Sequence, residues 1–123
     1  MLRSKPNRWL VCGLAMFASM ISPFAYADPV GGPQCGIHQV AAYGRNVFRV
    51  SFYGGELAGV RVIGDHDTDL DLYVYDEDGN LVASDSDYTD DCIAAWLPVW
   101  TGTFKIVVVN RGPVYNEYSI MVG

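Results

Sequence analysis

The chain has 123 residues and a formal net charge of −6, from 14 acidic residues and 8 Lys or Arg. Residues 28–123 contain all 14 acidic residues but only five of the basic ones, so their net charge is −9. This charge repels phosphate backbones and excludes nucleic acid as a partner. Ninety-six residues are enough for one domain and leave no room for a second core.

The N-terminal segment has the pattern of an export signal. Three basic residues precede an apolar run over residues 9–21, which is too short to span a bilayer comfortably. Ala25-Tyr26-Ala27 then supplies the small residues that a signal peptidase reads. We predict that residues 1–27 are a signal peptide, that the mature protein is secreted or periplasmic, and that it contains no membrane span.

Residues 28–44 are rich in Pro and Gly near their start and are expected to be an irregular lead-in. The signal peptide contains Cys12, so the mature chain keeps Cys35 and Cys92. An even pair of cysteines in a small exported domain predicts a Cys35–Cys92 disulfide; the alternative is two separate thiols. Such a bridge would close a long loop and stabilise the fold by about 4 kcal/mol.

The rest of the chain, residues 45–123, reads as short strands separated by turns, with no helix. Alternation of apolar and polar residues, as in Phe48-Arg49-Val50-Ser51-Phe52, is the pattern of half-buried strands. Asp78-Gly79 is a hairpin signal. The expected strands cover residues 46–53, 57–63, 70–75, 80–83, 92–97, 104–108 and 115–122. Their spacing predicts an all-β fold, an antiparallel β-sandwich or jelly roll of about seven to eight strands.

The inventory of catalytic groups is poor. The chain contains His38 and His66 but no Gly-x-Ser-x-Gly, His-Glu-x-x-His, phosphate loop or Cys-x-x-Cys motif. Carboxylates are abundant, but a glycosidase needs one carboxyl that keeps its proton in an apolar cleft, and a domain of this size has little room for a cleft. We therefore expect no enzymatic activity; a small hydrolase is the remote alternative.

The acidic residues gather in two segments that are candidates for a calcium site. Eight carboxylates lie in residues 65–71 and 85–91, with no Lys or Arg between Arg61 and Lys105. Calcium binds six to eight oxygens, often carboxylates brought together from loops. An EF-hand is excluded because Leu70 stands where that loop requires Gly. The alternatives are a solvated acidic surface and, less favoured, zinc bound through His66. The predicted calcium ligands are Asp65, Asp67, Asp69, Asp71, Asp85 and Asp87.

Aromatic residues supply a third candidate site. If they shared one surface, they could form a flat platform for a sugar ring or a peptide; otherwise they pack in and on the sandwich. The residues concerned are Tyr73, Tyr75, Trp96 and Trp100, with Tyr115.

Residues 45–122 resemble the bacterial pre-peptidase C-terminal domain family, which includes the collagen-binding domains of clostridial collagenases. The similarity lies in the order of several short motifs: Phe48-Arg49-Val50 with Gly54-Gly55-Glu56, the run Asp69-Leu70-Asp71-Leu72-Tyr73-Val74-Tyr75-Asp76 with Gly79-Asn80, Asp85 in an acidic loop, Gly102-Thr103-Phe104-Lys105-Ile106-Val107-Val108, and Tyr118-Ser119-Ile120.

The resemblance implies a β-sandwich and a non-catalytic module that helps an exported protein to fold, to be processed or to dock. It also implies calcium, although the segment that holds calcium ligands in the collagenase domains has one carboxylate here, Asp28. Cys35 and Cys92 are not general in the family, and a bridge between them could replace a metal clamp. Two hypotheses follow: a module that binds an extracellular polymer or protein, or a calcium- and disulfide-stabilised structural protein with no ligand of its own.

Overall fold

The computed structural model describes residues 27–123; the predicted signal peptide, residues 1–27, lies outside this part except for its last residue. Within the described residues no helix is long and apolar enough to cross a membrane. The described chain forms eight strands: β1 (Gln34–Val40), β2 (Arg45–Phe52), β3 (Ala58–Ile63), β4 (Leu70–Tyr75), β5 (Leu81–Asp85), β6 (Asp91–Trp96), β7 (Gly102–Asn110) and β8 (Asn116–Val122).

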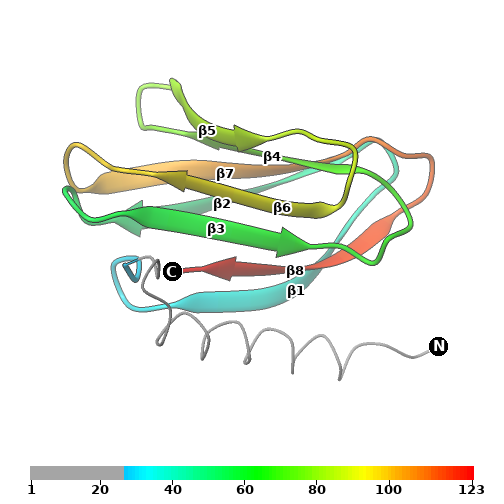
Figure 1. Cartoon of the computed structure of the whole chain (residues 1–123), viewed down its shortest axis with the longest axis horizontal. Coiled ribbons are helices and arrows are strands. Elements are labelled where there is room, and N and C mark those ends of the chain that lie inside the picture. The colour runs from blue at the N-terminus through cyan, green and yellow to red at the C-terminus, as the bar shows by residue number, and fades with distance from the viewer. Residues whose placement is uncertain (1–26) are drawn as a thin grey trace.

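The strands form two four-stranded sheets that pack face to face as a sandwich (Figure 1). One sheet has the order β1-β8-β3-β6 and the other β2-β7-β4-β5, and every pairing is antiparallel. This architecture confirms the predicted all-β, antiparallel sandwich of seven to eight strands.

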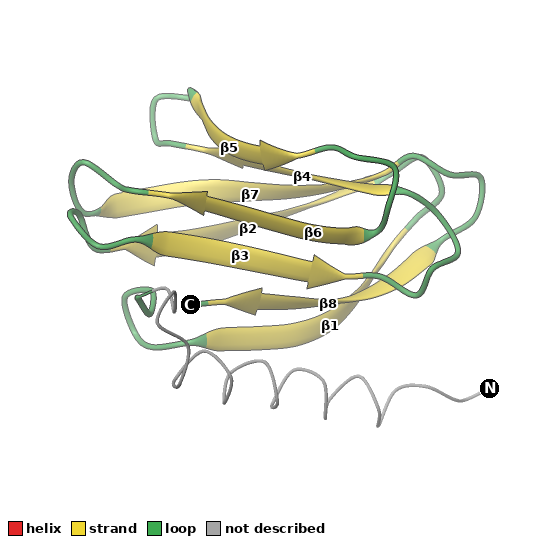
Figure 2. Cartoon of the chain, viewed as in Figure 1, coloured by secondary structure: helices red, strands yellow, loops and turns green. Residues whose placement is uncertain are grey.

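Consecutive strands mostly belong to different sheets, so that loops gather at the two ends of the sandwich (Figure 2). The turns β2–β3, β4–β5 and β6–β7 lie at one end, and the loops β1–β2, β3–β4, β5–β6 and β7–β8 lie at the other. Segments far apart in sequence therefore become neighbours at each end.

The β4–β5 connection is the tight hairpin that Asp78-Gly79 predicts. Gly79 takes a positive φ of 86°, which glycine adopts without steric cost. The Asp76 carboxylate accepts hydrogen bonds from the backbone N–H groups of Asp78 and Asn80, both at 2.9 Å. These hydrogen bonds lower the pKa of Asp76, and the bond from the Asn80 backbone has the largest effect.

The core lies between the sheets and is built by the predicted alternation. Leu70, Leu72 and Val74 of β4 point inward and are fully buried, and Val60 and Val62 of β3 meet them from the other sheet. Asp71, Tyr73 and Tyr75 consequently stand on the outer face of their sheet. The period-2 pattern thus decides which side chains remain available for binding.

The first strand corrects one prediction, because residues 28–44 are not irregular throughout. They contain β1, which pairs along its whole length with β8, from Gln34 opposite Val122 to Val40 opposite Asn116. Gly36 and the polar residues of β1 have low strand propensity. The strand forms because β8 offers an open edge and because Val40 is buried in the core.

Candidate functional site

Most of the predicted calcium ligands lie at one end of the sandwich, formed by residues 41–44, 64–69, 86–90 and 112–115, which we call the acidic end. The structure brings the two acidic segments together there. Gly64 donates its backbone N–H to the Asp90 carbonyl at 2.9 Å, and Leu70 donates to the Thr89 carbonyl at 3.3 Å.

At the acidic end, several carboxylates accept hydrogen bonds that fix the loops. Asp65 Oδ2 accepts the backbone N–H of Glu117 at 2.8 Å. Asp90 is buried and accepts the backbone N–H of His66 at 2.5 Å and the Asn116 side-chain amide at 3.2 Å. These carboxylates thus serve as hydrogen-bond acceptors that hold the loops in place. The sequence alone could not distinguish this structural role from metal binding.

The carboxylates of the β5–β6 region are used in the same way. Asp85 Oδ2 accepts the backbone N–H of Ile93 at 2.9 Å. Asp87 Oδ1 accepts the backbone N–H and the hydroxyl of Thr89, both at 3.0 Å. Local hydrogen bonding therefore offsets much of the repulsion that the clustered charges create.

Asp69 and Asp71 form the one pair in this region with unused buried oxygens among the described residues. Asp71 is 4% exposed, and its Oδ2 lies 2.6 Å from Arg111 Nε and 3.1 Å from the Tyr73 hydroxyl. The Oδ1 atoms of both Asp69 and Asp71 are buried and accept no hydrogen bond. Burial first, and then the charges of Asp71 and Asp87, raise the pKa of Asp69.

A calcium ion needs more ligands than this pair supplies. Residues 27–123 contain no group of three His, Cys, Asp or Glu side chains arranged to hold a metal ion. Asp71 already has a cationic partner in Arg111, and Asp67 is exposed in its loop. The six predicted ligands do not converge in the described structure, and calcium binding stays a prediction.

The predicted Cys35–Cys92 disulfide is not formed in this structure. Cys35 lies on β1 and Cys92 on β6, the two opposite edges of one four-stranded sheet. With strands about 4.8 Å apart, three strand spacings separate the two edges, far beyond the reach of a disulfide. Cys92 is instead a buried free thiol that donates to the Leu70 carbonyl at 3.2 Å. Burial is the main reason that the pKa of this thiol is raised to about 12.

The residues of the predicted aromatic platform are divided among four places. Trp96 is 7% exposed and packs in the core against Phe52, with ring centroids 5.0 Å apart, so it does not belong to an exposed platform. Tyr73 and Tyr75 share the outer face of β4, as the alternation predicts. Trp100 is exposed in the β6–β7 loop and Tyr115 in the β7–β8 loop, at opposite ends of the sandwich.

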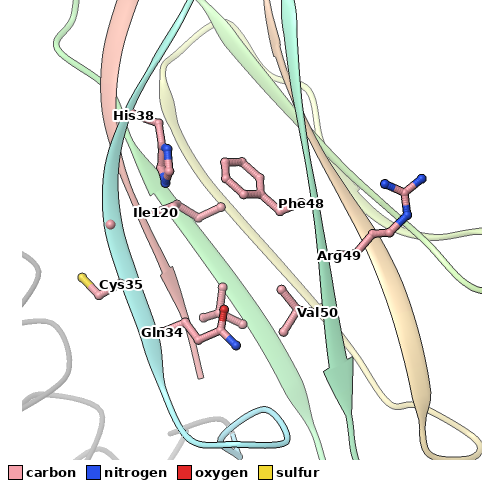
Figure 3. A pocket seen from close by; sticks show the side chains of 9 residues that line it. Gln34, Cys35, His38, Phe48, Arg49, Val50 and Ile120 are labelled. Atoms are coloured by element: carbon pink, nitrogen blue, oxygen red, sulfur yellow. The ribbon is translucent and has the colours of Figure 1, made fainter.

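A small cavity of about 180 Å³ opens between the edges of β1 and β2 (Figure 3). His38, Phe48, Val50 and Ile120 point toward it, whereas the Arg49 side chain points away. The rings of His38 and Phe48 meet edge to face, with centroids 4.9 Å apart. This cavity is largely aliphatic and aromatic, and the charged group nearest to it faces the opposite side of the sheet.

The end of the sandwich opposite the acidic end carries exposed apolar side chains; we call it the apolar end. Leu97, Val99 and Trp100 of the β6–β7 loop are 62%, 83% and 64% exposed. Tyr53 and Leu57, on either side of the β2–β3 turn, are also exposed. Of these residues, the sequence analysis named only Trp100 as a binding candidate. The apolar run Leu97-Pro98-Val99-Trp100 at the end of the expected strand 92–97 is a signal that could have found the others.

The two turns of the apolar end are held firmly together. Gly55 donates its backbone N–H to the Pro98 carbonyl at 2.8 Å, and Gly54 donates to Thr101 Oγ1 at 3.0 Å. The turns approach so closely that a Cβ on Gly54 would lie 2.4 Å from Trp100 Cα. The exposed side chains therefore belong to turns whose backbones are held together by hydrogen bonds and close packing.

Carboxylates border the apolar end. Glu56 lies inside the β2–β3 turn, and Glu77 of the β4–β5 hairpin accepts the backbone N–H of Thr103 at 3.1 Å. The three turns of this end, residues 53–57, 76–80 and 97–101, contain no Lys or Arg. The exposed apolar side chains of this end thus have carboxylates but no cations in the turns around them.

Solved structures with the same architecture are known, although no family model and no curated protein matches the sequence. The pre-peptidase C-terminal domain of a Bacillus anthracis collagenase aligns with a TM-score of 0.54 at 12% identity, over 72% of this chain and 88% of that one. PliG of Aeromonas hydrophila, a periplasmic inhibitor of g-type lysozyme, aligns at 0.51 and 12% identity, over 74% and 86%. The Yersinia pseudotuberculosis-derived mitogen aligns at 0.50 and 10% identity, over 76% and 85%.

These likenesses are in fold, since the identities are 10–12%. They support the predicted resemblance to pre-peptidase C-terminal domains at the level of architecture. The chain is thus an all-β sandwich with the same architecture as these domains.

Proposed function

We propose that this protein is a non-catalytic, exported binding module that captures a partner protein through its apolar end. The observation that carries the proposal is the exposure of Leu97, Val99 and Trp100 on a loop that is hydrogen-bonded to the β2–β3 turn. Large apolar side chains that are gathered at one place on a small domain mark an interaction site. Burial of each such side chain in a complex contributes about 1.5–3 kcal/mol.

The charges around the apolar end favour a protein partner over a membrane. Glu56 and Glu77 border the surface, and residues 28–123 carry a net charge of −9. Anionic lipid head groups would be repelled by these carboxylates. A protein cleft with an apolar floor and cationic rim is complementary, because an apolar centre with a polar rim is the usual anatomy of protein interfaces.

Export is part of the same proposal. The signal pattern in residues 1–27 supports it, and two of the fold neighbours are a domain of a collagenase and a periplasmic inhibitor. A binding role agrees with the fold, since sandwich modules present loops at their ends for recognition.

Site-specific photo-crosslinking tests the proposal directly. We place a photo-reactive amino acid at Val99 or, as a matched control, at Val114, an exposed valine of the acidic end. In cells of the natural source, position 99 should give discrete crosslinked protein bands and position 114 should not. Trp100→Ser should weaken capture at position 99 by about 30-fold or more, as expected for an aromatic anchor.

Two outcomes would contradict the proposal. Crosslinks to lipid alone at position 99 would assign the apolar end to a membrane. Equal crosslinking at positions 99 and 114, or none at either, would mean that the apolar end has no specific partner.

Calcium binding at the acidic end is a second candidate, favoured by the unused buried oxygens of Asp69 and Asp71. These two residues would supply carboxylate oxygens, and calcium would add positive charge where burial and repulsion raise the pKa of Asp69. The ion would have to complete its coordination with water, because the described residues offer no third converging side chain. Its role would be to stabilise the loops rather than to take part in a reaction.

A further inference from the structure

The outer face of the β2-β7-β4-β5 sheet concentrates the positive charge of the molecule. Four of the five Lys and Arg residues between positions 28 and 123 lie on this surface, which we call the basic face: Arg45, Arg49, Lys105 and Arg111. The fifth, Arg61, is exposed on β3 in the other sheet. Residues 28–123 have a net charge of −9, yet this face carries four cations against the one carboxylate of Asp71 on β4.

The strand register places two cations directly beside each other. Arg49 of β2 pairs with Lys105 of β7, and Lys105 pairs in turn with Tyr75 of β4. Like charges in directly opposite positions destabilise a sheet. The Lys105 ammonium lies 5.1 Å from the centroid of the Tyr75 ring, a cation–π contact that offsets part of this cost. Arg49 has no carboxylate partner among the described salt bridges.

An apolar row crosses the same face between the charged rows. Val47, Val107 and Tyr73 are paired across β2, β7 and β4. Arg45 lies two residues before Val47 on β2, and Arg49 two residues after it, about 7 Å away along the strand in each direction. Val107 itself is only 5% exposed, so an extended ligand along this row would contact mainly Val47 and Tyr73, with cations on both sides.

We propose that the basic face binds an acidic protein segment, an extended stretch in which apolar side chains alternate with Asp or Glu. The combination of Tyr, Arg and Val with a charged border is that of a protein interface. A sugar platform fits less well, because Lys105 covers the Tyr75 ring and the Tyr73 hydroxyl is engaged with Asp71 and Arg111. This surface is separate from the apolar end, and the proposal stands independently of the partner proposed there.

The test measures binding of three labelled polyanions to the purified protein at low and at physiological salt. The probes are a random copolymer of glutamate and tyrosine, polyglutamate, and polygalacturonate as a carboxylated glycan. The copolymer should bind most tightly, since only it offers both charge and apolar groups. Arg49→Glu should weaken copolymer binding by about tenfold or more, as expected when a charge in an interface is reversed.

Matched variants make the result decisive. Arg61→Glu changes the net charge by the same amount on the other sheet and should leave binding within about threefold, since it is outside the interface. Arg49→Gln removes the charge without adding repulsion and should show a smaller loss in the same direction. Trp100→Ser at the apolar end should have no effect.

Several results would overturn the inference. Polygalacturonate binding as tightly as the copolymer would assign the face to anionic glycans. Equal losses in Arg49→Glu and Arg61→Glu would show that only net charge matters. Absence of copolymer binding at low salt would leave the basic face without the proposed role, while the crosslinking test at Val99 would be unaffected.

Discussion

Cys92 shows how the environment of one side chain changes its chemistry. Its position on β6 places the thiol in the core, where it donates to the Leu70 carbonyl. Burial, and the negative charges of Asp85 and Asp87, disfavour the thiolate and raise the pKa from 9.0 to about 12. Such a thiol is a small core residue rather than a nucleophile.

High pH should therefore destabilise the protein. The folded thiol keeps its proton to a higher pH than the unfolded one, so the stabilisation is complete below about pH 9 and is lost as pH rises toward 12. Burial also raises the pKa of Tyr118 from 10.0 to about 12, so this group too loses its contribution to stability as the pH rises. Urea unfolding should show a free energy that falls by on the order of 1 kcal/mol per pH unit for each group.

Cys92→Ala is the control for this dependence. The variant is less stable at neutral pH but should lose less stability between pH 9 and 11 than the parent protein. An equal slope in both proteins would show that the Cys92 thiol does not contribute.

At the scale of elements, the apolar end depends on two turns that are distant in sequence. Tyr53 precedes the β2–β3 turn and Trp100 lies in the β6–β7 loop, and antiparallel pairing of β3 with β6 brings both turns to the same end. Gly54 allows the close approach, because it has no side chain to meet the Trp100 backbone. The binding surface is thus a property of the pairing and not of either loop alone.

Gly54→Ala should disrupt this junction. The added Cβ would lie 2.4 Å from Trp100 Cα, so the two turns must separate. We expect a loss of about 1–3 kcal/mol in the free energy of unfolding, the range for overpacked positions. Val99→Ala, at an exposed site in the same loop, should change it by less than about 0.5 kcal/mol. Urea denaturation of both variants checks this, and a Gly54→Ala protein as stable as Val99→Ala would contradict the proposed bracing.

Prediction from sequence succeeded for elements with strong patterns and failed for one with a weak pattern. The alternation in β4, with Leu70, Leu72 and Val74 inward, was visible in the sequence and is confirmed. β1 was missed because its residues have little intrinsic preference for a strand. Its structure comes from the open edge of β8, a partner more than 70 residues away.

At the scale of the whole molecule, charge and apolar surface are separated. One end of the sandwich carries Asp65, Asp69 and Asp90, the other carries the apolar loops, and the outer face of one sheet carries the cations. The net charge of −9 on residues 28–123 favours encounter with basic partners, and this attraction weakens as the salt concentration rises. Recognition should therefore depend on which surface faces the partner.

Thermal unfolding with millimolar calcium and with chelator tests the acidic end. Calcium that binds only the native state must raise the midpoint, and Asp69→Asn and Asp71→Asn should abolish the rise. In chelator, Asp69→Asn should itself raise the midpoint, because it removes a charge disfavoured by burial and by Asp71. Asp78→Asn, in the exposed hairpin at the other end, is the matched control. An unchanged midpoint in calcium would show that the native protein does not bind the ion.

The sequence by itself determined the all-β class, the inward and outward residues of most strands, and the concentration of acidic residues in two segments. These follow from local rules, since alternation and turn chemistry act between near neighbours. Only the tertiary structure decided that Cys35 and Cys92 lie at opposite edges of a sheet, that Trp96 is core while Trp100 is exposed, and that four cations share one face. Those features depend on strand order and register, which long-range pairing fixes and no short pattern encodes.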